Sequence, residues 1–424
     1  MNAPEGRNTP HIEAGDEVQA FYDRHPYPPP VVDLDRYRQL WQGGDRLRAD
    51  YYLHWPDASY REDFDILVAG CGTSQAARHA IRQPAARVFG IDVSSTSLDH
   101  TLALKEKYNL NNLQVLLLPI ERVHELETRF DKIICTGVLH HLSDPHVGLR
   151  SLRVVLKTNG AMHLMVYAAY GRTGVYMLQE YCRRLGIAAS EVEIEDLAAA
   201  LKELPRGHPL DHLLRDSPDF RNPGALADAL LNPRDRAYTV PQLFEIIEGC
   251  GLRFGRWYRQ APYLSNCGAI ASTPHRARIV KLSPQEQYAV VELFRGTISR
   301  HSLIAYRDDR PGDPQPVHFD GDAWLMYVPI RQPGVICLQE RLPVGAAAVL
   351  INQDHVDTDL IHPIDSPEKR LFDGIDGTKT IAEIMNSAAN AASRSLKQDR
   401  VRAFFKRLWR YDHVVIDASK GITS

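Results

Sequence analysis

The sequence has no CxxC pair, no long apolar run and no marked excess of charge of either sign. Its six cysteines are scattered over 424 residues, which argues against a zinc knuckle or a disulfide framework and indicates reduced thiols. No run reaches the roughly 18 apolar residues that a membrane span requires, and the polar N-terminal segment does not resemble a secretory signal. The net charge is −3, from 50 basic and 53 acidic residues, so bulk attraction to nucleic acid or anionic membranes is not expected. We therefore expect a cytoplasmic protein with neither membrane nor nucleic acid as a partner.

Short apolar runs alternate with helical patterns from Asp63 onward. Five runs are predicted to be strands: 64–70, 86–92, 113–119, 129–139 and 160–168. Continuous apolar strands separated by helices are typical of a parallel sheet buried on both faces. Two further runs, Leu252–Gln260 and Cys267–Thr273, are separated by few residues, which predicts an antiparallel closing hairpin. We expect an α/β fold whose five parallel strands are followed by a helical insertion, one more helix and this hairpin.

Changes in pattern predict three regions and one insertion. They are an N-terminal arm and cap (1–60), the sheet domain (61–275) with a helical insertion at about 172–238, and a C-terminal accessory region (276–424). The arm contains Pro26 and Pro28–Pro30, which disfavour helix and favour an extended chain. Its aromatic residues Phe21, Tyr22 and Tyr27 either form a structural strap or close over a pocket, and the sequence leaves both possibilities open.

The stretch ILVAGCGTSQAA, Ile66–Ala77, places two glycines between a strand and a helix. Gly70 and Gly72 would let a ligand approach the backbone closely, next to the positive end of the helix. Asp92 ends the following strand 20 residues after Gly72, where an acid can bind a ribose diol. A dinucleotide loop would need a third glycine at Gln75. S-adenosylmethionine has no pyrophosphate, so it fits a GxGxS loop better than NAD does, although an NAD(P)-dependent oxidoreductase remains an alternative.

Over about residues 60–275 the chain resembles the class I S-adenosylmethionine-dependent methyltransferases. The resemblance implies a Rossmann-like seven-stranded sheet with an antiparallel last strand, and S-adenosylmethionine as cofactor. The cofactor-binding residues that it implies are Gly70, Cys71, Gly72, Asp92, Val93, Ile120, Glu121 and Gly137. Two positions depart from the family pattern, because Val68 stands where an acid is usual and Ser74 replaces the third glycine. A catalytically silent protein that binds S-adenosylmethionine or S-adenosylhomocysteine therefore stays open.

The segment after the fourth strand, CTGVLHHLSDP, would lie beside the transferable methyl group, because ligands bind at the carboxyl ends of such strands. His140 and His141 are its candidate catalytic residues, and holding the strand end is the alternative role. VLHHL is similar to methyltransferases of quinone C-methylation. The motifs of adenine amino-group and cytosine C5 methylation are absent.

After the fifth strand comes a cluster of polar aromatic residues with one arginine. The candidate substrate-binding residues are Tyr167, Tyr170, Arg172 and Tyr176. With the helical insertion they form either a lid over a small-molecule acceptor or ordinary helix packing. No metal site is expected.

The C-terminal stretch LFDGIDGTKTIAEI resembles winged-helix-like modules that bind peptides or partners, over about residues 365–420. Its last helix carries several Lys and Arg residues, which solvated helix charge explains more readily than DNA binding. The module predicts a protein partner or self-association.

Overall fold

The structure is a computed structural model that describes residues 14–216, 220, 222–392 and 397–421. The first 13 residues of the predicted N-terminal arm lie outside this part. The main sheet consists of β1 (Asp65–Ala69), β2 (Arg87–Asp92), β3 (Leu113–Leu117), β4 (Phe130–Thr136), β5 (Leu156–Ala168), β6 (Ala237–Tyr238), β7 (Leu252–Trp257) and β8 (Arg300–Arg307). Seven of these strands run in the order β3-β2-β1-β4-β5-β8-β7, and β6 pairs with the end of β5. Strand β8 is antiparallel to both of its neighbours. The predicted Rossmann-like sheet with an antiparallel last strand is thereby confirmed.

The last strand comes from a different segment than the sequence predicted. Cys267–Thr273 does not form a strand, because Gly268 has φ of 69° and the following Ala269–Ser272 is a 3-10 helix. Helix α13 (Pro284–Arg295), in the region predicted to be accessory, ends at a left-handed Gly296, and β8 follows. Because β8 lies between β5 and β7, the sheet extends to residue 307, past the predicted boundary at 275.

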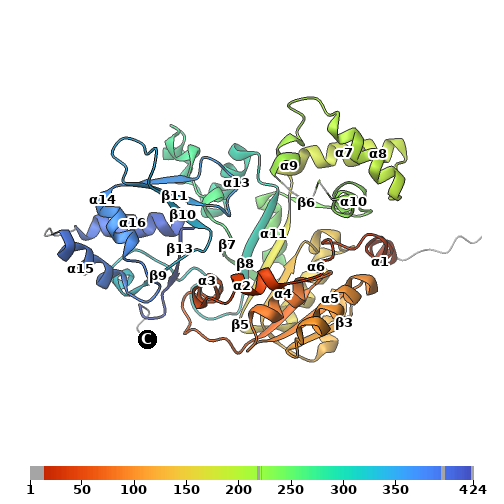
Figure 1. Ribbon diagram of the computed structural model, residues 1–424, viewed down its shortest axis with the longest axis horizontal. Coiled ribbons are helices and arrows are strands. Elements are labelled where there is room, and N and C mark those ends of the chain that lie inside the picture. Colours follow the sequence, from red (N-terminus) through yellow and green to blue (C-terminus); the bar gives the residue numbers. More distant parts are fainter. Residues whose placement is uncertain (1–13, 217–219, 221, 393–396, 422–424) are drawn as a thin grey trace, which may run out of the picture.

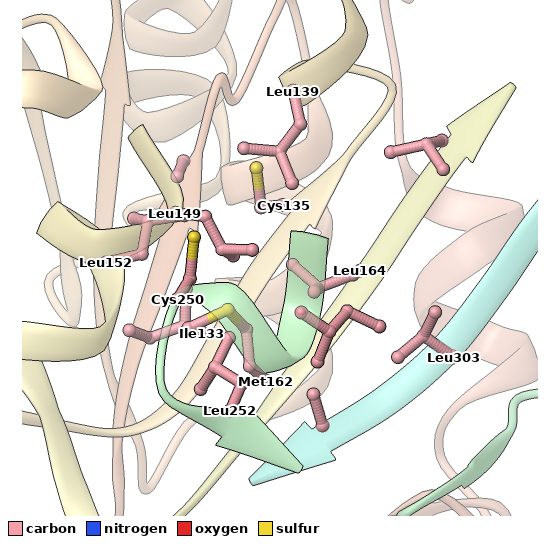
Figure 2. Packing of buried hydrophobic residues seen from close by; sticks show 14 of the residues in the cluster. Ile133, Cys135, Leu139, Leu149, Leu152, Met162, Leu164, Cys250, Leu252 and Leu303 are labelled. Carbon is pink, nitrogen blue, oxygen red and sulfur yellow. The ribbon is translucent and has the colours of Figure 1, made fainter. Parts of the chain in front are cut away.

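Each face of the sheet is covered by its own set of helices. One face packs on α3 (Gly44–His54), α4 (Gln75–Arg82) and α5 (Ser95–Tyr108), and the other on α6 (Pro145–Val155) and α11 (Val240–Gly249). Figure 2 shows part of the second face, where β4, β5 and β8 meet α6 and the α11–β7 turn through Ile133, Cys135, Leu139, Leu149, Leu152, Met162, Leu164, Cys250, Leu252 and Leu303. Because side chains alternate along a strand, neighbouring residues of β1 enter different cores.

The helical insertion forms a separate cluster above the carboxyl end of the sheet (Figure 1). It contains α7 (Thr173–Leu185), α8 (Glu191–Lys202), α9 (Asp211–Asp216) and α10 (Pro223–Leu231), which share one apolar core. Phe21 of helix α1 (Ala14–Arg24) packs into this core. The predicted extended arm therefore begins only after α1 and ends before α2 (Asp35–Leu40).

The C-terminal region lies on the side of the sheet away from the insertion (Figure 1). Strands β10 (Val335–Leu338), β11 (Ala348–Asn352) and β12 (Ile361–Ile364) form an antiparallel sheet, and β13 (Val414–Asp417) pairs with β9 (Val328–Arg331). Helices α14 (Ser366–Asp373), α15 (Ile381–Ala392) and α16 (Gln398–Arg410) pack between these sheets. Strand β13 pairs with β9, which lies outside the stretch of about residues 365–420 that resembles a winged-helix-like module. No helix in the described ranges is both long and apolar enough to cross a membrane.

Candidate active site

The glycine loop is packed tightly between β4 and the N-terminal arm. Gly70 and Gly72 have φ of 70° and 54°, a region that side chains other than glycine rarely adopt. A Cβ atom on Gly72 would lie 2.8 Å from the carbonyl oxygen of Tyr27, and one on Gly70 would overlap Val138. Both glycines are therefore needed for the shape of this loop.

Asp92 at the end of β2 is tied to the glycine loop. Its Oδ2 accepts a hydrogen bond from the Gly72 amide at 2.8 Å, and its Oδ1 accepts one from the Ser94 amide at 3.0 Å. Burial raises the pKa of Asp92, although these amide hydrogen bonds act in the opposite direction. The carboxylate thus stands beside the glycine loop, where the sequence predicted it.

One cavity of about 1040 Å³ connects these groups with the insertion and the C-terminal region. The predicted cofactor residues that line it are Gly70, Gly72, Asp92, Val93, Ile120, Glu121 and Gly137. Cys71 is not among the lining residues, because its thiol is buried in the core next to Gly90. The residues predicted to bind the cofactor after β1, β2, β3 and β4 therefore line one common cavity.

The valine that replaces the usual acid does not face this cavity. Val68 is fully buried among the residues that pack on α4 and α5. Polar groups reach the cavity instead from α4 and the end of β4, where Gln75 Nε2 donates a hydrogen bond to Thr136 Oγ1 at 2.8 Å and Arg78 lies one helical turn further on. In the sequence, Gln75 stands where a dinucleotide loop would need a glycine, and no motif indicates a role for Arg78 or Thr136.

The two adjacent histidines have different surroundings. His140 is fully buried against the Tyr167 ring, with a centroid distance of 3.9 Å, and neither ring nitrogen has a hydrogen-bond partner among the described residues. Burial lowers its pKa well below the usual value. His141 lines the cavity, and its Nδ1 lies 2.5 Å from the carbonyl oxygen of Arg234. A carbonyl only accepts, so Nδ1 carries a hydrogen and Nε2 of the neutral ring has a free lone pair.

Two of the four predicted substrate residues reach the cavity. Tyr167 and Arg172 line it, with the guanidinium 3.5 Å from the centre of the Tyr167 ring. Tyr170 is 41% exposed and does not line the cavity. Tyr176 stands behind Arg172, and burial raises its pKa to about 12. The spacing of these four residues in the sequence did not indicate which of them would reach the cavity.

A group of three potential metal ligands lies next to the histidines. One ligand atom from each of His140, His141 and Asp235 falls within 4.8 Å of the others. Arg172, however, pairs with Asp235 at 3.1 Å, and Gln179 donates to the same oxygen at 2.8 Å. Because Arg172 and Gln179 already occupy the carboxylate, we interpret Asp235 as a partner of these two side chains of the insertion.

The N-terminal arm closes one side of the cavity. Tyr22, Tyr27 and Pro28 line it, and the Pro28 carbonyl accepts a hydrogen bond from Thr73 Oγ1 at 2.7 Å. Asp23 accepts a hydrogen bond from Ser94 Oγ at 2.7 Å, at the start of α5. Of the two roles left open for the arm's aromatic residues, closing over a pocket fits Tyr22 and Tyr27.

The opposite wall comes from the C-terminal region. Asp357 and Asp359, in the connection between β11 and β12, line the cavity and pair with the buried Arg295 at 3.4 and 3.0 Å. Nothing in the sequence pattern pointed to this connection, because it is far along the chain and lacks a motif. The region predicted to be accessory therefore contributes directly to the site.

Comparison with known proteins agrees with this geometry. Residues 67–162 match a family model described as a methyltransferase domain. An uncharacterised protein of Synechococcus sp. is 28% identical over 74% of this chain and 76% of its own length. A ubiquinone biosynthesis O-methyltransferase of Neisseria meningitidis is 27% identical over 29% of this chain and 57% of its own length.

Among solved structures, PKMT2 from Rickettsia typhi has a similar fold. The TM-score is 0.62 at 16% identity, over 91% of this chain and 75% of that one. The same protein in complex with AdoHcy gives a TM-score of 0.59. These two structures show the fold alone, whereas the family match over residues 67–162, which include the glycine loop and Asp92, indicates a class I S-adenosylmethionine-dependent methyltransferase domain. The protein is thus an enzyme of the methyl-transferring class.

Proposed function

We propose that the protein transfers the methyl group of S-adenosylmethionine to a small-molecule acceptor held beneath the helical insertion. The observation that carries this proposal is the single cavity shared by the glycine loop, Asp92, the end of β4 and the insertion. Its volume of about 1040 Å³ is at the upper end of the range of roughly 300–1,000 Å³ for small-molecule sites. It therefore offers room for a cofactor and a small acceptor together.

The cofactor's parts are assigned to residues by chemistry. Asp92 would accept hydrogen bonds from the ribose hydroxyls, and Ile120 and Glu121 would flank the adenine. The methionine carboxylate suits the Arg78 guanidinium, and its amino group suits the oxygens of Gln75 and Thr136, which stand in for the acid missing at Val68. When bound, S-adenosylmethionine supplies an electrophilic methyl group, and the chain's own contribution is alignment and proton removal.

His141 is the better placed of the two candidate bases. It lines the cavity with Nε2 free to accept a proton, whereas His140 is buried behind it against Tyr167. We assign His141 to proton removal from the acceptor and His140 to support of the strand end. Turnover by a His141→Gln variant tests this role.

Calorimetry with S-adenosylhomocysteine, S-adenosylmethionine and NADH tests the proposal. We expect saturable binding of the first two and an affinity loss of at least about 10-fold for Asp92→Ala, because two charge-assisted hydrogen bonds are removed. Asp196→Asn, an exposed change on α8, is the matched control and should bind normally. NADH binding without S-adenosylhomocysteine binding would refute the proposal, and binding without turnover on an acceptor panel would favour the silent alternative.

A further inference from the structure

Asp228 on α10 is a buried carboxylate that lines the cavity without a cationic partner in the described part of the chain. Asp228 is 2% exposed and lies on the cavity wall. It accepts hydrogen bonds from Tyr22 Oη at 2.8 Å, from Tyr167 Oη at 3.4 Å and from Asn232 Nδ2 at 3.2 Å. All three donors are neutral groups. A buried charge is normally paired with an opposite charge, so the arrangement around Asp228 is incomplete.

Asp92 also lines the cavity without a cationic partner, but its two oxygens each accept a backbone amide hydrogen bond, from Gly72 and from Ser94. Two other acids have a guanidinium partner: Asp235 pairs with Arg172 at 3.1 Å, and Asp359 pairs with Arg295 at 3.0 Å. The hydroxyl groups beside Asp228 cannot supply the missing charge. Burial and the neighbouring carboxylate raise the pKa of both Tyr22 and Tyr167 well above the usual value, so both remain neutral donors.

Aromatic rings surround the same part of the cavity. The His141 ring lies 6.1 Å from that of Tyr22 and 5.9 Å from that of Tyr167, with centroids as reference points. All three rings line the cavity, as Asp228 does. Such walls suit an alkyl chain that ends in a positive charge, because ring faces attract cations and exclude water.

From this arrangement we infer that the methyl acceptor is an aliphatic amine, whose ammonium form binds to Asp228 between Tyr22, His141 and Tyr167. The inference rests on the proposed methyl transfer and names its acceptor class. The ammonium first loses one proton to His141 Nε2, which passes it to solvent. The nitrogen lone pair then forms the N–C bond to the methyl carbon, and the C–S bond breaks with its electron pair staying on sulfur. The products are the N-methylammonium and S-adenosylhomocysteine.

The cofactor itself carries two positive groups that could compete for this carboxylate, namely the sulfonium and the methionine amino group. The three possibilities differ in what Asp228→Asn would change. An amine site leaves the affinities for S-adenosylmethionine and S-adenosylhomocysteine unchanged. A sulfonium site weakens only S-adenosylmethionine, and an amino-group site weakens both.

The experiment titrates the full-length protein, saturated with S-adenosylhomocysteine, with n-hexylamine, 1-hexanol and hexanoate at pH 7. These probes share one alkyl chain and differ in charge. We expect hexylamine to bind at least about 10-fold more tightly than the other two, because only it pairs with a buried carboxylate. Asp228→Asn should remove this preference, while Asp196→Asn, an exposed change on α8, should retain it.

Several outcomes would overturn the inference. Equal or tighter binding of hexanol or hexanoate, no saturable binding of hexylamine, or a preference unchanged in Asp228→Asn would each do so. Weakened cofactor binding in that variant would instead assign Asp228 to the cofactor. The comparison of probes on the unaltered protein stands even if Asp228→Asn folds poorly. Failure of S-adenosylhomocysteine to bind at all would refute the proposed function and is visible before any amine is added.

Discussion

Lys132 of β4 offers a sharp test of how the sheet is held to the N-terminal helices. Its side chain is 1% exposed, and Nζ donates a hydrogen bond to Asp50 Oδ2 on α3 at 2.8 Å. Arg82 on α4 approaches the same oxygen at 3.4 Å. One carboxylate therefore compensates two buried cations, so the two ends of this network are not equivalent.

Because one carboxylate faces two cations, removing the carboxylate should cost more stability than removing one cation. Lys132→Met leaves Asp50 with Arg82 still beside it, so the free energy of unfolding should fall by about 3 kcal/mol, the lower end for breaking a buried pair. Asp50→Asn leaves two buried cations facing each other and should cost about 5 kcal/mol. Lys157→Met, whose side chain is 39% exposed, is the control and should cost about 1 kcal/mol or less.

Urea unfolding followed by far-UV circular dichroism measures these differences. Burial lowers the pKa of Lys132 to about 8, below that of the unfolded chain. Between pH 8 and 10 the unfolded state then binds more protons, so this residue makes the free energy of unfolding rise with pH. Lys132→Met should lack that rise. The reasoning is refuted if Lys132→Met lies within 1 kcal/mol of the wild-type value, or if Asp50→Asn is the milder change.

Two predictions concern the site itself. Gly72→Ala places a side chain at a φ of 54° and within 2.8 Å of the Tyr27 carbonyl oxygen, so affinity for S-adenosylhomocysteine should fall at least about 10-fold. Gly249→Ala, where nothing lies within 4 Å, should bind normally, and equal losses would contradict the argument. His141→Gln should lower kcat by about 100-fold on a methylated acceptor, with cofactor affinity unchanged. An unaltered kcat would leave His141 without a role in proton transfer.

The part of the site that the sequence predicted is the part built from consecutive segments. Gly70, Gly72 and Asp92 follow buried strands, and parallel strands place their carboxyl ends at one edge. Local pattern and topology together therefore suffice for the part of the cavity around the glycine loop. Strand β8 was not predicted, because four of its consecutive residues are buried, and apolar and polar side chains do not alternate along it. A short apolar run of this kind is equally compatible with a strand and with a buried helix.

The part of the cavity beneath the insertion depends on contacts between distant segments, which the sequence pattern does not show. Asp228 lies on an apolar helix whose pattern resembles ordinary packing, and Tyr22 is 206 positions away along the chain. Asp357 and Asp359 reach the cavity through an ion pair with Arg295 that no local rule predicts. Such groups become recognisable only when burial and distances are known, because each residue type alone is common on surfaces.

The place of β8 in the sheet bears on how the chain acquires its shape during synthesis. Strand β7 (Leu252–Trp257) has β8 (Arg300–Arg307) as its neighbour in the sheet and stands at the end of the strand order. The segment leaving the ribosome can build β1 to β5 early, but β7 cannot join until β8 has emerged. A shortened protein ending near residue 275 would expose the edge of β5 and leave β7 unpaired, which favours aggregation. Dissection of this protein should therefore cut after residue 307.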